Sequence, residues 1–229
     1  MINIIGLQKI TLLDYPGKIS CIIFLEGCNL RCPFCHNSEI ICEANNDKEY
    51  ISEEYILNFL KNRYGILQGV VITGGEPLLH DISDFIRKIK ELNYDIKLDT
   101  NGTFPDRLEY LIKEKLIDYI AMDIKNDVPR YNSTSGCKSI NINNIYKSIS
   151  IIMNSNIDYE FRTTVLKYVH DNESFYNIGK MIKGASKYYI QPFINRDTVS
   201  VKGLSSPDKD ELKEFKDIMT NYVSHVGIR

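Results

Sequence analysis

The sequence lacks the features that mark membrane, secreted and nucleic-acid-binding chains. It has no apolar run approaching the roughly 18–20 residues that a membrane span requires. Its opening residues carry neither the basic segment nor the apolar stretch of a secretory signal. Positive charge is not in excess either, since 28 Lys and Arg stand against 30 Asp and Glu, for a formal net charge of −2. We therefore expect a cytosolic protein with no nucleic-acid or membrane partner.

The composition is that of an ordinary globular chain. Its 229 residues are 43% hydrophobic and 25% charged, which leaves enough apolar material for a core and excludes disordered and collagen-like classes. We find no internal repeat and no composition shift that would mark a domain boundary. The expectation is a single domain over residues 1–229, with a core of residues 12–193 and a C-terminal helix near residues 207–222.

Strand-like segments alternate with helical ones along the chain. Apolar residues recur at helical spacing at Ile82, Phe85, Ile86 and Ile89, and again at Ile142, Ile145, Tyr146 and Ile149. Helices are expected to begin at Ser52 and at Ser206-Pro207. The expected strands are Ile19–Leu25, Gly69–Thr73, Asp95–Asp99, Asp118–Ile124, Asp158–Leu166 and Lys187–Phe193.

This alternation predicts an α/β fold with parallel strands. Six units are too few for the closed eight-unit barrel, so we expect a partial (βα)6 TIM-like barrel, with a doubly wound open sheet as the alternative. Three strands carry polar pairs two residues apart, which lie on one face. These faces are interpreted as the lining of a partly open barrel that holds a charged ligand, rather than as solvent-facing surfaces. The pairs are Lys97 with Asp99, Asp123 with Lys125, and Glu160 with Arg162.

Three cysteines are concentrated in one short stretch. Cys28, Cys32 and Cys35 occur in the sequence CNLRCPFC, directly after the first expected strand. Soft thiolates at this spacing favour an iron–sulfur cluster, and three of them on a four-iron cluster would leave one iron open to an outside ligand. The alternatives are a zinc site completed by His36 or Cys42, or inert thiols. Cys21, in an apolar run, is expected in the core, whereas Cys42 and Cys137 have no assignment.

Two further motifs follow later strands. Gly74-Gly75-Glu76-Pro77 offers close backbone approach and a carboxylate for an ammonium group, although alone it is equally an ordinary turn. Asp99-Thr100-Asn101-Gly102 places an acidic side chain at a strand end, where ribose hydroxyls are bound, and Asn-Gly is also a routine turn signal. All three motifs lie at the carboxyl ends of successive strands, where a βα barrel builds its active site.

The combination resembles the radical S-adenosylmethionine (SAM) superfamily, whose characteristic motif is Cys-x3-Cys-x-aromatic-Cys. Phe34 occupies the aromatic position in this sequence. The resemblance covers the chain from Leu12 to Phe193. Within the superfamily it is most similar to the glycyl-radical-enzyme activating branch. The stretch TLLDYPGK at residues 11–18 is especially similar to the short activating proteins of anaerobic ribonucleoside-triphosphate reductase. Pyruvate formate-lyase activating enzymes, which have a Gly where Tyr15 stands, are the next most similar.

The resemblance implies a role for each matching residue. The three motif cysteines would bind one 4Fe–4S cluster, whose open iron takes the amino and carboxylate groups of SAM. Gln191 matches another cofactor contact only loosely, and His80, His170 and His225 have no motif support and are expected at the surface or at helix ends. Implied SAM contacts are Gly74, Gly75 and Glu76 at the amino group, Phe34 near the adenine, Asn37, Asp99 near the ribose, and the ligand-facing Asp123, Lys125 and Arg162; Asp99 and Thr100 resemble a monovalent-cation site.

The reaction implied by the resemblance begins with an electron from reduced flavodoxin or ferredoxin. SAM is then cleaved to a 5′-deoxyadenosyl radical, which removes a hydrogen atom from a glycine of a partner glycyl radical enzyme. Residues 126–141 are interpreted as a loop at the barrel mouth, either docking that partner or simply mobile. The alternatives are a radical SAM enzyme acting on a small molecule, a metal-binding module without catalysis, and a nucleic-acid-modifying radical enzyme, which the charge balance disfavours.

Overall fold

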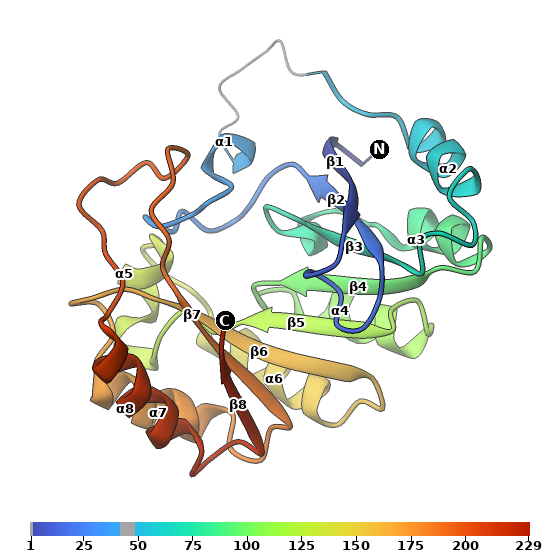
Figure 1. Ribbon diagram of the computed structural model, residues 1–229. Coiled ribbons are helices and arrows are strands. Elements are labelled where there is room, and N and C mark those ends of the chain that lie inside the picture. Colours follow the sequence, from blue (N-terminus) through green and yellow to red (C-terminus); the bar gives the residue numbers. More distant parts are fainter. Residues whose placement is uncertain (1, 42–48) are drawn as a thin grey trace. The chain divides into compact units, whose positions relative to one another are not determined.

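The computed structural model describes residues 2–41 and 49–229 (Figure 1). The chain forms two compact units. The first contains Met1–Asn29, Glu39–Thr100 and Asp106–Ile120, and the second contains Leu30–Ser38, Asn101–Pro105 and Ala121–Arg229. The expectation of a single domain therefore stays a prediction, and each unit is described by itself.

The helices and strands follow one another in the order in which they are labelled in Figure 1. The strands are β1 (Ile4–Thr11), β2 (Ser20–Leu25), β3 (Gly69–Gly74), β4 (Asp95–Thr100), β5 (Tyr119–Asp123), β6 (Asp158–Val165), β7 (Lys187–Pro192) and β8 (His225–Ile228). The α-helices are α1 (Ser38–Ile41), α2 (Glu53–Lys61), α3 (Ser83–Lys90), α4 (Pro105–Lys113), α5 (Tyr131–Ser135), α6 (Ile142–Met153), α7 (Asn172–Met181) and α8 (Lys209–Met219), and the 3-10 helices are η1 (Pro77–Leu79) and η2 (Val128–Arg130).

The first unit is built on a parallel ladder. β2 pairs with β3 from Ser20 opposite Gly69, and β3 pairs with β4 from Gly69 opposite Asp95. The backbone amide of Asp118 donates to the carbonyl of Ile96, which brings the start of β5 beside β4. The predicted parallel strands are confirmed here to within a residue or two. β1 was not predicted, and it pairs antiparallel with β2, because the chain returns through a short turn rather than a helical crossover.

Helices of the first unit follow the expected pattern. Ser52 caps α2 by accepting a hydrogen bond from the amide of Tyr55 at 3.1 Å, as predicted. In α3, the apolar stripe predicted from the sequence is buried throughout. The first-unit core is made of these helix faces and the strands beneath them, since β2 and β3 are buried almost without interruption. Such continuous burial is typical of parallel strands that are covered on both faces.

The second unit contains another parallel ladder. β6 pairs with β7, and β7 pairs with the unpredicted β8, in which His225 is the exposed first residue. The amide of Ile124 donates to the carbonyl of Arg162 at 2.8 Å, so the end of β5 lies beside β6. Helices α7 and α8 lie side by side (Figure 1), joined by Phe175 and Phe215, whose rings stack at 4.2 Å. The predicted α/β class with parallel strands is confirmed.

Three details of the sequence-based prediction are wrong. The last helix begins two residues later than expected, because Asp208 rather than Ser206 caps it and forms a capping box with Glu211. The stretch 126–141 is not a plain loop, since it contains η2 and α5. Of the two places expected for His170, the surface is wrong, because only 4% of the residue is exposed, whereas the helix end is right, since it directly precedes Asp171, the cap of α7. Within the described part of the chain, no helix has the length and hydropathy that crossing a membrane would need.

Candidate active site

The turn after β3 in the first unit depends on its two glycines. The amide of Gly75 donates to the carbonyl of Leu25 at 2.9 Å, and the amide of Glu76 donates to the carbonyl of Gly27 at 2.8 Å. A Cβ on Gly75 would lie 1.9 Å from the Gly27 oxygen and 3.2 Å from the Cβ of Cys28. Only glycine permits this approach, so the turn lies directly against the backbone that leads into the first motif cysteine.

Glu76 is the buried carboxylate of this turn. The residue is 0% exposed, although carboxylates are rarely buried without partners. Its Oε1 accepts a hydrogen bond from Thr100 Oγ1 at 2.8 Å and one from the amide of Leu78 at 3.0 Å. The structure therefore brings together Cys28, Gly75, Glu76 and Thr100, which the sequence analysis selected from three separate motifs.

Asp99 is ion-paired at the end of β4. Its carboxylate accepts a hydrogen bond from Lys97 Nζ, and Lys97 is 1% exposed. This polar face is thus buried and internally neutralised, which contradicts the solvent-facing alternative. The expected monovalent cation at Asp99 and Thr100 stays a prediction.

In the second unit, a tight turn carries the other two motif cysteines. The amide of Cys35 donates to the carbonyl of Cys32 at 3.1 Å, and both cysteines are partly exposed and form no disulfide. Phe34 points into an apolar cluster with Leu166, Phe193 and Val199 and is 5% exposed. The aromatic residue of the motif therefore anchors the cysteine turn to the core, and its expected place near the adenine stays a prediction.

The zinc alternative for the cysteines required a fourth metal ligand, either His36 or Cys42. His36 stacks on Phe193, and its Nε2 is hydrogen-bonded to the carbonyl of Ile194 at 2.7 Å, so this nitrogen already has a partner. Cys42 lies outside the described residues. Within the described residues, neither unit by itself gathers three His, Cys, Asp or Glu side chains into a ready metal site. Asn37 lies half-buried in the turn just before α1.

The end of α5 holds the cysteine turn in place. The amide of Arg31 donates to the carbonyl of Ser135 at 3.0 Å. Gly136 ends α5 with a φ of +68°, and a Cβ there would lie 1.9 Å from the carbonyl oxygen of Arg31. The stretch between Cys28 and Cys32 is therefore in direct backbone contact with a helix more than 100 residues further along the sequence.

A buried ionic triad lies at the end of β5 and on β6. Asp123 accepts from Arg162 Nε through Oδ1 at 2.9 Å and from Lys125 Nζ through Oδ2 at 3.0 Å. Although burial opposes ionisation, Arg162 and Lys125 hold the pKa of Asp123 well below its ordinary value. Asp123 in turn raises the pKa of Lys125 against the effect of burial. Asp123 and Lys125 are therefore both charged, and the guanidinium of Arg162 is always charged in a protein.

Cys32 lies in the electrostatic neighbourhood of this triad. Burial raises the pKa of the Cys32 thiol, and the positive charge of Lys125 partly opposes the shift. The nearby thiol of Cys137 adds to the rise. A thiol in such a setting is not a reactive thiolate by itself, and a metal that binds it would have to displace its proton.

Glu160 of the third polar pair is bound to the C-terminal arginine. It is 1% exposed. Its two carboxylate oxygens accept hydrogen bonds from both terminal nitrogens of Arg229 at 3.0 Å each. The guanidinium of Arg229 lies 3.3 Å from the ring centre of Tyr189. This pair is a structural contact of the second unit.

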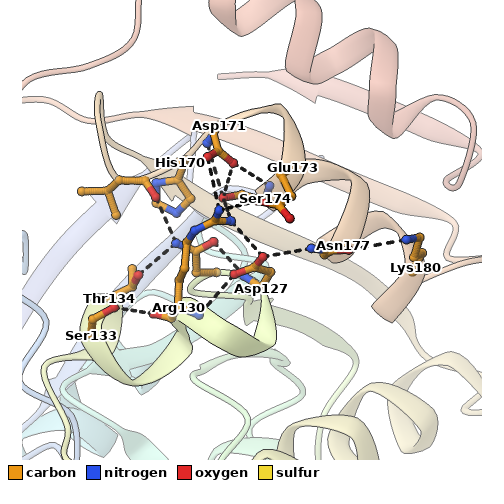
Figure 2. Close-up of polar contacts among 12 residues, drawn as sticks. Asp127, Arg130, Ser133, Thr134, His170, Asp171, Glu173, Ser174, Asn177 and Lys180 are labelled. Carbon is orange, nitrogen blue, oxygen red and sulfur yellow. Dashed lines mark hydrogen bonds and ion pairs between the residues drawn. The ribbon is translucent and has the colours of Figure 1, made fainter.

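A polar network joins η2 to the start of α7. Figure 2 shows the Arg130 guanidinium among the carboxylates of Asp127, Asp171 and Glu173, at 2.9, 3.3 and 2.7 Å. Asp127 is fully buried and also accepts from Asn177 Nδ2 at 3.1 Å. The network fixes the short helical segment that leads into α5.

His170 was missed by the sequence analysis and belongs to the same region (Figure 2). Its Nδ1 accepts a hydrogen bond from the amide of Leu166 at 3.2 Å, so Nε2 carries the proton and donates to the carbonyl of Lys125 at 2.9 Å. Burial lowers the pKa of His170. A neutral imidazole thus connects the ends of β5 and β6, and nothing in the local sequence signals this contact.

The family model described as the radical SAM superfamily matches residues 22–179. The chain belongs to the radical SAM superfamily. This match includes the cysteine motif, the Gly-Gly-Glu turn and the triad, and it confirms the prediction of a radical SAM enzyme.

Similar proteins were found along nearly the whole chain. A Methanocaldococcus jannaschii protein, whose name describes it as a glycyl-radical enzyme activating enzyme, is 36% identical over 98% of this chain and 94% of its own length. The pyruvate formate-lyase-activating enzyme of Clostridium pasteurianum is 27% identical over 92% of this chain and 94% of its own. A radical SAM methyltransferase from Sphaerobacter thermophilus has the same fold, with a TM-score of 0.71 at 13% identity, over 94% of this chain and 67% of its own.

Proposed function

We propose that this radical SAM enzyme is an activase that installs a glycyl radical on a partner enzyme, and that the partner is an anaerobic ribonucleoside-triphosphate reductase. The activase function is supported chiefly by the 36% identity, over 98% of the chain, to a protein named as a glycyl-radical enzyme activating enzyme. The choice of partner rests on the TLLDYPGK stretch at residues 11–18. Flavodoxin or ferredoxin is proposed as the electron donor.

The donor set fits a 4Fe–4S cluster by its chemistry. Cys28, Cys32 and Cys35 are partly exposed, form no disulfide and lie close together in the sequence, and soft thiolates select iron–sulfur clusters. Three such ligands leave one iron available for SAM. When bound, the cluster supplies the electron that opens the sulfonium bond of SAM, and the protein orients the reactants and excludes water.

The chain's own residues provide complementary charges for SAM. The buried carboxylate of Glu76, held by Thr100 and the Leu78 amide, is a fixed partner for the ammonium group. The cationic side chains of Lys125 and Arg162 suit the carboxylate group. Within each unit these hydrogen bonds and ion pairs form without ligand, so each side chain is already oriented by its own neighbours.

The test is anaerobic reconstitution with iron and sulfide, reduction, addition of SAM, and chromatography of 5′-deoxyadenosine. We expect product from the wild-type protein and none from Cys32→Ala, with most of the fold retained by circular dichroism. Cys137→Ala is the matched control, since this thiol lies near Cys32 but outside the motif. It should keep full iron content. Iron loss in Cys137→Ala would contradict the assignment of three ligands and an open iron.

A second candidate partner is a pyruvate formate-lyase. It is favoured by the 27% identity, over 92% of the chain, to the activating enzyme of Clostridium pasteurianum. Incubating the reduced, SAM-loaded protein with either purified partner and recording electron paramagnetic resonance separates the two. A glycyl radical doublet with the reductase supports the proposed partner. A doublet only with the lyase would show that the partner is a pyruvate formate-lyase instead. SAM cleavage without a radical on either would favour a small-molecule substrate.

A further inference from the structure

Tyr168 combines an exposed aromatic ring with a strained backbone. The residue lies in the turn that follows β6 and is 93% exposed. Its φ is +66°, in the left-handed region where a bulky residue is an outlier. Lys167 Nζ lies 5.9 Å from the ring centre, at the outer limit of a cation–π contact, so the ring gains little within the chain. A glycine would avoid both the strain and the exposed ring, and stability therefore does not explain the tyrosine.

The turn that carries Tyr168 is fixed by hydrogen bonds on both sides. The amide of Lys167 donates to the carbonyl of Ser205 at 2.9 Å. The amide of His170 donates to the carbonyl of Leu166 at 3.2 Å, and His170 Nδ1 accepts from the Leu166 amide at 3.2 Å. These bonds determine the backbone, so the ring is held out in solvent before any partner arrives. Strain that the surrounding structure maintains in this way is concentrated at functional sites.

A pocket of about 310 Å³ lies beside Tyr168 in the second unit. Its apolar lining includes Pro33, Phe34, Leu166 and Leu204. Phe34 and Leu166 belong to the apolar cluster that anchors the cysteine turn. The volume is at the lower end of the range for ligand pockets, about 300–1,000 Å³, which suits one or two side chains of a docked polypeptide.

The position of the pocket indicates which polypeptide docks there. Pro33 and Phe34 stand between Cys32 and Cys35, so the cysteine turn itself forms part of the pocket wall. In the proposed function, a glycine of the partner enzyme must reach the radical that forms at these cysteines, so a segment of the partner passes close to this turn. A second copy of this chain bound at the same place would block that approach. Tyrosine is also among the residues that most often anchor protein interfaces.

We infer that Tyr168 and the adjacent pocket bind an apolar segment of the glycyl radical enzyme that this protein activates. The inference rests on the proposed function and adds to it the surface that recognises the partner. The ring packs against the bound segment, and an apolar side chain of that segment enters the pocket over Phe34 and Leu166. Burial of the ring in the complex offsets its exposure in the free protein.

Tyr168→Gly separates this role from a structural one. Because glycine adopts a φ of +66° without strain, the thermal midpoint of the protein alone should be unchanged or raised. Glycyl radical formation is then followed by electron paramagnetic resonance at increasing partner concentration, with whichever of the reductase and the lyase gives a doublet with the wild-type protein. The KM for the partner should rise about ten- to a hundredfold, as for an interface anchor, with kcat nearly unchanged. The SAM dissociation constant of cluster-loaded protein should stay unchanged.

Two further variants serve as controls. Tyr146→Ala removes another exposed tyrosine of the same unit, 42% exposed on α6, and should leave the KM for the partner unchanged. Tyr168→Phe keeps the aromatic ring and should retain most of the partner affinity, because the apolar ring rather than the hydroxyl makes the contact.

Several results would overturn the inference while the proposed function stands. An unchanged KM in Tyr168→Gly, or an equal rise in Tyr146→Ala, would show that the ring is not the anchor. A lower thermal midpoint in Tyr168→Gly would show that the ring supports the fold. A weaker SAM affinity would assign the pocket to the cofactor, and altered sedimentation of the protein alone would assign it to a second copy. If the wild-type protein forms no glycyl radical on either partner, the proposed function fails together with the inference.

Discussion

At the scale of single residues, Glu76 shows how burial and charge combine in a binding group. Its carboxylate is fully buried and retains two hydrogen bonds through Oε1. In Glu76→Gln, an amide oxygen can accept the same two bonds, so the fold should survive while the negative charge is lost. We expect the SAM dissociation constant to rise about ten- to a hundredfold, the usual loss for one charge-assisted contact.

Equilibrium dialysis of cluster-loaded protein measures this effect, and Glu26→Gln is its control. Glu26 belongs to the same unit and accepts hydrogen bonds from Asn3 and Tyr50. The control removes one negative charge from the first unit, as Glu76→Gln does. Unchanged affinity in Glu76→Gln, or an equal loss in Glu26→Gln, would show that Glu76 is not the ammonium partner.

A second residue-scale prediction concerns His170 and pH. Because burial lowers its pKa in the folded state, the unfolded chain takes up a proton more readily than the folded one. The stability that the neutral imidazole contributes is therefore present above about pH 6.5, the ordinary histidine value, and is lost as the pH falls below it.

Urea unfolding between pH 5 and 8 measures this pH dependence, and the free energy of unfolding should fall as the pH is lowered. In His170→Asn, the side-chain oxygen can accept from the Leu166 amide, and the free energy of unfolding should depend less on pH. An unchanged pH dependence would show that other titratable groups cause it.

At the scale of elements, the contact between α5 and the cysteine turn gives the next prediction. Gly136→Ala forces a Cβ to 1.9 Å from the Arg31 carbonyl oxygen at a φ of +68°. We expect it to cost about 3 kcal/mol or more of unfolding free energy, the upper range for single substitutions, and to reduce the iron content after reconstitution.

Gly203→Ala is the matched control for this substitution. Gly203 has a φ of +82° and no atom within 4 Å of a built Cβ. It should therefore cost only the backbone strain, about 1–2 kcal/mol, and leave the iron content unchanged. Urea unfolding and iron analysis of both variants provide the measurement. Equal losses of unfolding free energy and equal iron contents in the two variants would show that the Arg31 contact does not support the cysteine turn.

Elements with a strong local pattern could be predicted, and those defined by distant contacts could not. β2 to β7 were found from their apolar runs, but β1 was missed because Leu7 to Ile10 are partly or fully exposed and do not alternate. β8 is only four residues long, below what periodicity can detect. Likewise, the motif residues of the site were found from spacing. His170 was not, because its role depends on Lys125 and Leu166 as the fold places them.

At the scale of the whole molecule, the Glu160–Arg229 pair is expected to contribute to the free energy of unfolding. Glu160 is 1% exposed, so removal of Arg229 would take this ion pair and its two hydrogen bonds from a buried carboxylate. A fully buried pair broken in this way costs about 3–5 kcal/mol, and the partly exposed arginine reduces our expectation for Arg229→Ala to about 2–3 kcal/mol.

Urea unfolding of three variants distinguishes this pair from an ordinary surface contact. Lys187→Ala breaks the exposed ion pair with Asp158 on the neighbouring strands, at 3.4 Å, and should cost less than about 1 kcal/mol. Glu160→Gln combined with Arg229→Ala should be more stable than Arg229→Ala alone, because the uncompensated buried charge is then gone. If Arg229→Ala costs no more than Lys187→Ala, water reaches Glu160 in solution, and the buried pair does not hold β6 to the end of β8.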